Sequence, residues 1–368
     1  MAYDVRVSYR TLPQDSDTFA SDYGYPTLSV GLRWQKNHGI TMHKPVSSSW
    51  PYLEEVDYDS KMGNIVTLYG QFSRPLWQND RWQVGYDLNI GVGYSHLRYN
   101  VTNNIDNEII GAHWNIFFGM GANASYRMGK NWGMTGGVQF YHHSNGALNR
   151  PNKGANILSP YAGVYFLWDK SSDSHATTVP HSHTQKSFDP SLYLQFDLAV
   201  GSRTMLEEWI HTQFETRPDE EDYRKAAFRN HVTYSFQTSL MYRYARQWAS
   251  GIGTDVYYGN YHKRAEEFNS LRGYEYKKLS PWSVGLSLHH EVFYHRLSLP
   301  MSLGFYLYRN MGEMAKELEK PYYETIGLSY RIPGIEWKIG GRVKAHLAKA
   351  DLTEFTISIP LKIHSSPF

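Results

Sequence analysis

Cysteine, long apolar runs and a surplus of one charge are all missing from this sequence of 368 residues. Without cysteine, the chain has neither a disulfide framework nor a cysteine-based metal site. Because no run of about 18 apolar residues occurs, a membrane-spanning helix is excluded. The 37 Lys and Arg residues nearly balance the 35 Asp and Glu residues, so the charge gives no reason to expect a nucleic-acid partner.

Aromatic side chains, by contrast, are abundant, at 15% of the sequence, with 30 Tyr and 11 Trp. This content suits the aromatic girdles at the two edges of a membrane β-barrel, although a soluble β-rich binding protein also fits it. Met1 and the residues after it do not form a signal peptide, so a barrel made from this sequence is expected to be a mature form with a new start residue.

Apolar and polar residues alternate in several long segments. Between Trp82 and Tyr94 the even positions are apolar or aromatic, while the odd positions carry Gln, Gly, Asp and Asn. Similar alternation occurs in Trp282–Tyr294, Leu297–Leu307 and Phe355–Ile363. Strands of soluble β-sandwiches also alternate, but these runs exceed the roughly five or six residues usual there, and the small polar set suits a wet lumen. The sequence therefore predicts an all-β fold: a transmembrane antiparallel up-and-down β-barrel of about 14–16 strands, in a bacterial outer membrane.

The connections between these segments largely alternate in length, as short turns and long loops do in outer-membrane barrels. Tight turns are expected near Gly129-Lys130, Arg246-Gln247, His295-Arg296 and Pro333-Gly334. The longer segments between them are Tyr99–Glu108, Asn145–Ile157, Arg203–Asn230, Tyr261–Ser280 and Asn310–Pro321. The exception is Lys170–Pro190, a polar stretch on the side of the short turns. Residues 171–190 are thus a long loop of one barrel or a linker between two eight-stranded units, with residues 1–170 and 191–368 on either side.

His142 and Ser144 are two residues apart at the end of one predicted strand. Val138 and Phe140 precede them and place the even positions of this strand on the apolar face. Both polar residues therefore continue a row that is expected to meet lipid. Residues two apart in a strand lie on one face about 7 Å apart, which allows an imidazole and a hydroxyl to come within hydrogen-bond reach. Such a pair meets the first requirement for a serine nucleophile with a histidine base.

A third residue is needed to orient the imidazole, and the next predicted strand offers Asn156. Asn156 begins the outward row of that strand, so an antiparallel neighbour would bring it beside His142. Its amide oxygen can accept the imidazole N–H, as the Asn of Cys-His-Asn enzymes does, although it stabilises an imidazolium less than a carboxylate would. Because the chain has 17 histidines, the alternative is a chance His-x-Ser pair, solvated near the membrane interface.

Residues 142–156 resemble the active-site region of outer-membrane lipid A 3-O-deacylases. In that family a His-x-Ser-Asn strand end is followed by Leu, Pro-Asn and Gly, and then by an acidic residue that opens the last strand. The matching residues here are His142, Ser144, Asn145, Leu148, Pro151, Asn152 and Gly154. The sequence departs from the family at Asn156, where the family has Glu. The resemblance covers Pro26 to Lys170 and looks closest to the longer acyloxyacyl-hydrolase-like members of Bacteroides-type bacteria.

The resemblance implies a carboxylic ester hydrolase that removes an acyl chain from lipid A of the outer leaflet, with no cofactor and no metal. The implied catalytic residues are Ser144 as nucleophile, His142 as base and Asn156 as orienting group. Residues 1–170 would then be the deacylase-like half and 191–368 further barrel strands. The implied oxyanion donors and one supporting residue are Asn152, the Gly146 backbone N–H and Asn145.

Outer-membrane phospholipase A is a second family that the segment resembles, since it has His-x-Ser-Asn-Gly followed by Asn as its third member. Asn145-Gly146 and Asn156 fit that pattern. Against it, residues 147–151 lack the carboxylate of that family's Arg-x-x-Asp-Pro-like stretch, and so lack a calcium ligand. The substrate is accordingly lipid A or a phospholipid, and a porin-like barrel without enzymatic activity is the third alternative.

Two other groups of histidines are candidate metal ligands. Adjacent residues of a strand point to opposite faces, so His289 and His290 are not expected to share one metal ion with Glu291. The tract His175–His183 would bind metal only adventitiously. Residues Gly341–Asp351 echo the strand that carries His142 but contain no serine, so no second hydrolase site is expected there.

Overall fold

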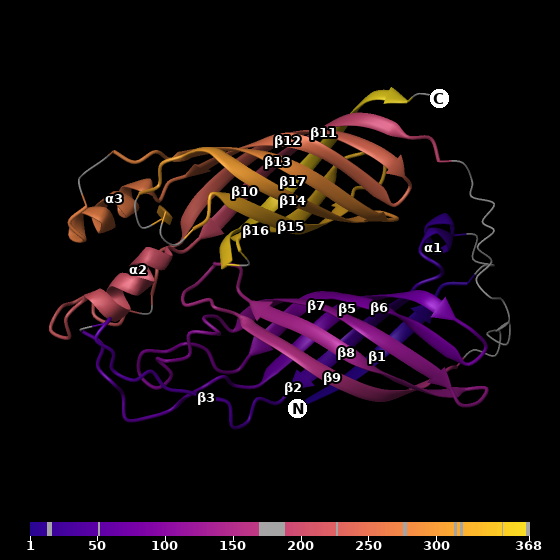
Figure 1. Cartoon of the computed structure of the whole chain (residues 1–368), viewed down its shortest axis with the longest axis horizontal. Coiled ribbons are helices and arrows are strands. Elements are labelled where there is room, and N and C mark those ends of the chain that lie inside the picture. Colours follow the sequence, from indigo (N-terminus) through magenta and orange to yellow (C-terminus); the bar gives the residue numbers. More distant parts are fainter. Residues whose placement is uncertain are drawn as a thin grey trace.

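The computed structural model describes residues 1–12, 17–50, 52–168, 188–225, 227–274, 278–312, 315–316, 319–347 and 349–365. Within these ranges most residues lie in β-strands, which form an open seven-stranded sheet and a closed eight-stranded barrel (Figure 1). No helix in the same ranges is long and apolar enough to cross a membrane. The prediction of an all-β antiparallel barrel protein is confirmed, and the seven and eight strands fall in two units rather than one ring.

The first unit is the open sheet, in which each strand runs antiparallel to the next. Its strands are β1 (Ala2–Arg10), β2 (Thr27–Gln35), β5 (Ile65–Gln78), β6 (Trp82–Ser95), β7 (Trp114–Arg127), β8 (Trp132–Ser144) and β9 (Ala155–Phe166). Helix α1 (Thr18–Asp22) lies between β1 and β2, and the short pair β3 (Thr41–Met42) and β4 (Ser60–Lys61) lies between β2 and β5. The sheet curls around polar side chains: Arg33 Nη2 donates to Gln139 Oε1 at 2.6 Å across its inside.

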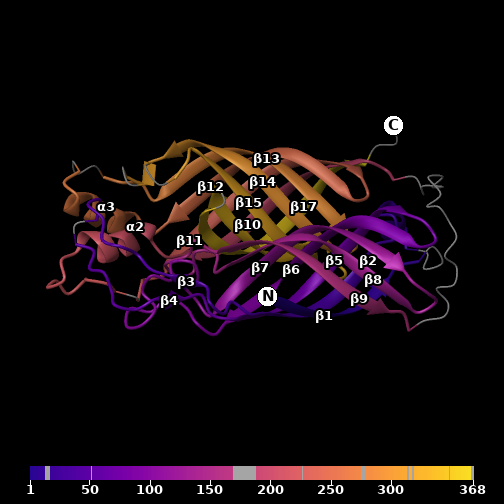
Figure 2. The same ribbon diagram turned by 60° about the horizontal axis from the view of Figure 1, so that its bottom comes forward.

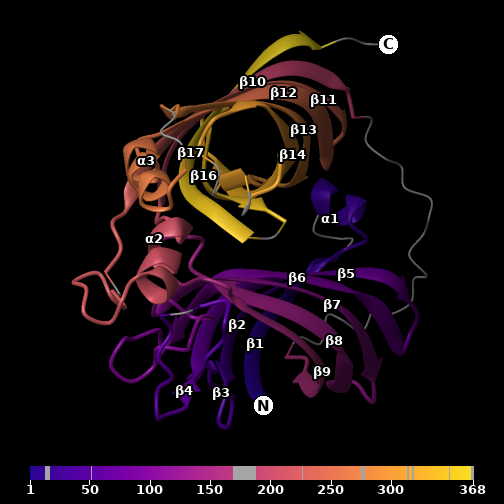
Figure 3. The same ribbon diagram turned by 60° about the vertical axis from the view of Figure 1, so that its left-hand side comes forward.

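The second unit is the closed barrel, which Figure 3 shows nearly end-on. Its strands are β10 (Ser191–Arg203), β11 (His231–Ala245), β12 (Trp248–Gly259), β13 (Trp282–Tyr294), β14 (Leu297–Arg309), β15 (Tyr322–Arg331), β16 (Lys338–His346) and β17 (Lys349–Ser365), and β10 pairs with β17 to close the ring. Three helices lie in its long loops: α2 (Leu206–Ile210), the π-helix η3 (His211–Glu215) and α3 (His262–Leu271).

Strand β13 shows how the alternating sequence produces an inner and an outer face. Leu288 faces outward with 63% of its surface exposed, while Ser287 is buried inside the barrel. His289 and His290 point to opposite faces, since His289 Nε2 is 2.7 Å from Ser287 Oγ and His290 Nδ1 is 2.9 Å from Ser250 Oγ. The predicted separation of these two histidines is therefore confirmed.

Tryptophans mark both ends of the strands. Strands β6, β7, β8, β12 and β13 each begin at a Trp with 38% to 66% of its surface exposed, and these residues are Trp82, Trp114, Trp132, Trp248 and Trp282. Since Trp prefers the interface between lipid and water, this distribution fits a barrel with an aromatic girdle at each edge.

Ion pairs fill the inside of the barrel. Lys338 Nζ lies 2.5 Å from Glu291 Oε1, and Arg342 donates to Glu354 Oε2 from Nε at 2.9 Å and from Nη2 at 2.6 Å. All four residues are at most 6% exposed. An eight-stranded barrel has an interior just wide enough for side chains, so these pairs occupy the space that a channel would need. This packing argues against the porin-like alternative.

The connections largely follow the predicted alternation; the exceptions are the short turn from β16 to β17 at one end and the longer segment with α1 between β1 and β2 at the other. The four expected tight turns join β7 to β8, β11 to β12, β13 to β14 and β15 to β16. We call the end of the molecule that carries them the turn end, and the opposite end the loop end. The predicted loop or linker at 171–190 joins β9 to β10 at the turn end, and its residues 171–187, with the tract His175–His183, lie outside the described residues.

The two units contact each other at both ends. At the turn end, Tyr23 OH beside α1 donates to the Phe293 carbonyl oxygen at 2.9 Å. At the loop end, Leu53 packs with Trp209 and Phe214 in an apolar cluster. Figure 2 shows α2, α3 and loops of both units gathered at this end. The loops of the first unit are therefore packed against the helices of the second.

Replacement of Glu354 tests the interior ion pairs. Glu354→Gln leaves the buried Arg342 charge without its carboxylate, and we expect the free energy of unfolding to fall by about 3–5 kcal/mol. Thermal unfolding of the folded barrel, followed by circular dichroism, measures this change. Glu336→Gln is the matched control because Glu336 pairs with an exposed Arg331, and such pairs contribute little. Equal effects of the two substitutions would contradict the account.

Candidate active site

His142 and Asn156 lie directly opposite each other in the register of β8 and β9. His142 Nδ1 is 2.6 Å from Asn156 Oδ1. Because an amide oxygen only accepts hydrogen bonds, Nδ1 carries the proton and Nε2 of the neutral ring has a free lone pair. Asn156 is exposed and the next residue along β8, His143, is fully buried. The pair therefore lies on the outward face, as the sequence predicts, and no described residue forms a hydrogen bond with Nε2.

Ser144 is the last residue of β8, on the same side of the strand as His142. It pairs with Ile116 of β7 and is 9% exposed. Within the described part of the chain, no hydrogen bond joins Ser144 Oγ to the His142 ring. In enzymes this contact is often loose without substrate and tightens in the complex. The structure thus brings together the base and its orienting residue, with the hydroxyl next to them in sequence.

Gly154 gives the His142 ring its space. A Cβ atom on this glycine would lie 2.5 Å from His142 Cε1 and 3.2 Å from Nε2. Its φ of +74° is also a conformation that favours glycine. The backbone at Gly154 therefore packs against the imidazole and restricts its orientation, which explains the Gly in this part of the motif.

Asn152 and Asn145 are joined through the loop after Ser144. The Asn145 backbone N–H donates to Asn152 Oδ1 at 2.9 Å, which fixes the Asn152 amide group. Asn145 Oδ1 accepts the Asn149 backbone N–H at 3.3 Å. Asn145 Nδ2 is buried and has no hydrogen-bond partner among the described residues. A buried donor without a partner beside a candidate nucleophile is a feature of oxyanion sites, and the sequence had given Asn145 only a supporting role.

The same loop is held by the second unit. Thr353 Oγ1 of β17 donates to the Gly146 carbonyl oxygen at 2.6 Å. Thr204, which follows β10, donates from both N and Oγ1 to the Ala147 carbonyl oxygen at 2.9 Å. Gly146 and Ala147 have φ of +63° and +68°, a conformation that is unfavourable for alanine. These contacts hold Ala147 in that conformation, and no local sequence signal pointed to them.

Arg150 adds a third contact between the loop and the second unit. Its Nε and Nη2 donate to the Thr204 carbonyl oxygen at 3.2 and 3.1 Å. Burial, with a smaller effect of the nearby Arg203, lowers the pKa of Arg150 to about 10. The guanidinium is therefore still charged at neutral pH, which strengthens its hydrogen bonds to the carbonyl.

A separate group at the loop end of the barrel has the composition of a metal site. Glu319, His346 and Asp351 offer ligand atoms within 4.8 Å of one another. Both carboxylates, however, pair with Arg203, and Asp351 also faces Lys344. His346, in the segment that echoes the His142 strand, points into the barrel and lies 2.9 Å from Tyr306 OH. The group is a buried ion-pair network, and its histidine faces away from the membrane.

Two family models match this chain. The model described as lipid A 3-O-deacylase (PagL) matches residues 22–165, which include the whole of the candidate site. The model described as acyloxyacyl hydrolase, C-terminal domain, matches residues 193–362, which make up most of the closed barrel. Together they cover most of the sequence. The chain belongs to the lipid A 3-O-deacylase family. The resemblance found over residues 142–156 is thereby confirmed at the level of the family.

Solved structures of several outer-membrane proteins align with this structure over most of its residues. The COG4313 outer membrane channel from Pseudomonas putida F1 is 10% identical, with 91% of this chain and 95% of that chain covered and a TM-score of 0.20. The Pseudomonas putida toluene transporter TodX is 8% identical, with coverages of 97% and 81% and a TM-score of 0.20. No curated protein matches the sequence.

The hydrogen bond from Thr353 can be removed by a substitution that keeps the shape of this side chain. In Thr353→Val the Gly146 carbonyl loses its donor, and we expect kcat for ester hydrolysis to fall about fivefold, with KM nearly unchanged, because the loop after Ser144 is less well held. Thr353→Ser keeps the hydroxyl and is expected to keep the activity. Steady-state kinetics on the folded protein measure both. A Val variant as active as the wild type would show that the contact does not position the loop.

Proposed function

We propose that this protein is a hydrolase of the bacterial outer membrane that removes an ester-linked acyl chain from lipid A, with Ser144 as nucleophile. The observation that carries the proposal is the 2.6 Å contact between His142 Nδ1 and Asn156 Oδ1 on the outward face. Membership of the lipid A 3-O-deacylase family supports the substrate. On this proposal residues 1–170 carry the hydrolase site, and the closed barrel within residues 191–368 supports it.

The first half of the reaction forms an acyl-enzyme. Asn156 holds the Nδ1–H of His142, so Nε2 can take the proton of Ser144 as Oγ attacks the carbonyl carbon of the ester. The carbonyl electron pair moves to oxygen, and the oxyanion is stabilised by the N–H groups of Asn152, Asn145 and Gly146. When the carbonyl re-forms, the ester C–O bond breaks and the leaving alkoxide of the sugar takes the proton from Nε2.

The second half releases the fatty acid. A water molecule gives its proton to His142 Nε2 and attacks the acyl-enzyme carbonyl. The bond to Ser144 Oγ then breaks, and Oγ takes the proton back from Nε2. Every proton is returned, so His142 and Ser144 end the cycle in the state in which they began it. Because the residues lie on the outward row, the ester can be attacked while its lipid stays in the membrane.

Ser144→Ala tests the nucleophile. We expect it to abolish release of fatty acid from lipid A, since no other described side chain in the loop offers a hydroxyl. Mass spectrometry of lipid A from cells that express each variant measures the loss of one acyl chain. Ser8→Ala, which removes an exposed strand hydroxyl paired with Ser29, is the control. Unchanged lipid A in cells that express the wild-type protein would refute the proposed substrate.

Asn156 tests the orientation of the base. Asn156→Ala leaves the His142 ring without its partner, and we expect kcat to fall by roughly 100-fold. Asn156→Glu restores an acceptor, with the negative charge that the family pattern has at this place, and is expected to recover most of the activity. Equal activity of the Ala and Glu variants would show that the contact at Nδ1 does not matter for the reaction.

A phospholipase A is the second candidate, and the observation that favours it is the Asn at the third position of the triad. The chemistry at Ser144 would be identical, with a phospholipid acyl ester as substrate. Residues 147–151 contain no carboxylate for calcium. Fatty-acid release from phosphatidylethanolamine vesicles that calcium restores after chelation, with lipid A left intact, would favour this candidate over the first.

A further inference from the structure

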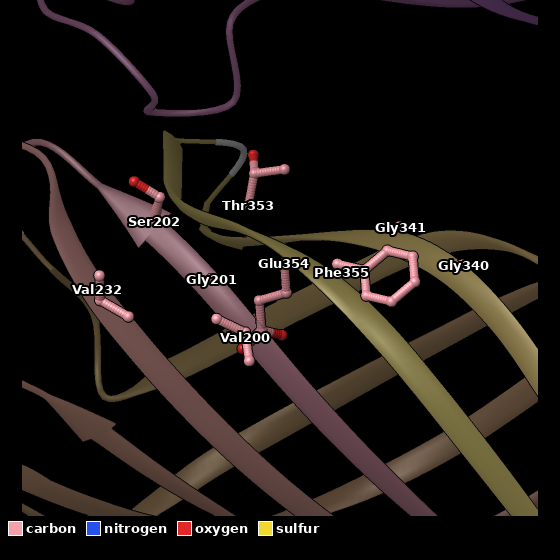
Figure 4. Close-up of a pocket in the computed structure, with 9 residues that line it drawn as sticks. All are labelled: Val200, Gly201, Ser202, Val232, Gly340, Gly341, Thr353, Glu354 and Phe355. Carbon is pink, nitrogen blue, oxygen red and sulfur yellow. The ribbon is translucent and has the colours of Figure 1, made fainter.

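A depression of about 580 Å³ opens on the outer wall of the closed barrel, at its loop end (Figure 4). We call it the outer-wall groove. Strands β10, β11, β16 and β17 form its floor. The residues that line it include Val200, Ser202, Val232, Gly341, Thr353 and Phe355. The depression is shallow and largely open to the outside.

The groove presents no charge. Val200 and Phe355 are 53% and 57% exposed on its surface. Glu354 lies on its border, but this side chain is buried and paired with Arg342 inside the barrel. At Gly341 a Cβ atom would have its nearest neighbour at 3.8 Å, so the space exists because this outward position carries no side chain. An apolar ligand fits such a surface, and a charged one does not.

The groove continues to the candidate active site through Thr353. This residue lines the groove, and its Oγ1 donates to the Gly146 carbonyl oxygen at 2.6 Å. Gly146 is two residues after Ser144, and two residues span at most about 7 Å. One end of the groove therefore lies beside the loop that follows the nucleophile, although groove and nucleophile belong to different units.

Polar side chains lie at one end of the groove and apolar side chains follow, just as the polar ester group of an acyl ester is followed by its hydrocarbon chain. Ser202 pairs with Thr353 across β10 and β17, and Val200 pairs with Phe355 one step further from the loop end. Figure 4 shows the two hydroxyl groups at one end of the groove, with Val200 and Phe355 beyond them. The polar end thus lies beside the loop that follows Ser144, and the apolar end extends away from it along the barrel wall.

We propose that the outer-wall groove binds a fatty acyl chain of the lipid substrate while its ester lies at Ser144. The proposal rests on the proposed function. An acyl chain is the occupant because the groove is uncharged, lies on the outer wall of the barrel and begins beside the loop that follows Ser144. The closed barrel then binds substrate directly, in addition to its contacts with the loop.

Filling the groove tests this proposal. Gly341→Trp places a large side chain in the space, and hydrolysis is measured on p-nitrophenyl palmitate and p-nitrophenyl butyrate in detergent micelles. We expect the ratio of kcat/KM for palmitate to that for butyrate to fall about tenfold, since two or more methylenes lose their contacts. Leu288→Trp, on β13 at the opposite wall of the barrel, is the matched control and is expected to leave the ratio unchanged.

Phe355→Ala gives an independent test should the Trp variant fail to fold. It removes apolar surface from the groove without blocking it, and is also expected to lower the palmitate-to-butyrate ratio. A ratio that stays at the wild-type value in folded Gly341→Trp or in Phe355→Ala would overturn the proposal. Failure of the proposed function is a different result, in which the wild-type protein itself hydrolyses neither ester and leaves lipid A intact.

Discussion

The two-residue period of the β-strand is the constraint on which the rest of this structure depends. It sends every second side chain outward and leaves the others inside. Inside, the protein buries ion pairs such as Arg342 with Glu354. Outside, the same period puts His142 and Asn156 in neighbouring strands of one outward row. The hydrogen bond between them then follows from the register.

The closed barrel holds the loop beside this site through a few direct hydrogen bonds. Thr353 and Thr204 hold the carbonyl groups of Gly146 and Ala147, two residues whose positive φ values need support. The loop between β8 and β9 belongs to the first unit, and its conformation is therefore stabilised by hydrogen bonds from the second. The two units therefore contribute differently to the site: a strand end of the open sheet carries His142 and Ser144, and the wall of the closed barrel positions the loop beside them.

The sequence predicted the features that depend on short-range geometry. Alternation predicted the fold class, and turn residues predicted the tight turns. The outward rows of two neighbouring antiparallel strands predicted that His142 and Asn156 would pair. Closure is different, because it depends on the stagger summed over all strands. Alternation alone could not show that the strands divide into an open sheet and a closed ring. Nor could it place Thr353 beside Gly146, which is 207 residues away.

The central claim is that His142, oriented by Asn156, activates Ser144 on the outward face of the open sheet. Treatment of the folded protein with a lipophilic fluorophosphonate, followed by peptide mass spectrometry, measures this activation directly. The account predicts that the label is found on Ser144 and that His142→Ala prevents the labelling. Labelling of Ser144 that proceeds equally well without the histidine, or no labelling at Ser144 in the wild-type protein, would contradict it.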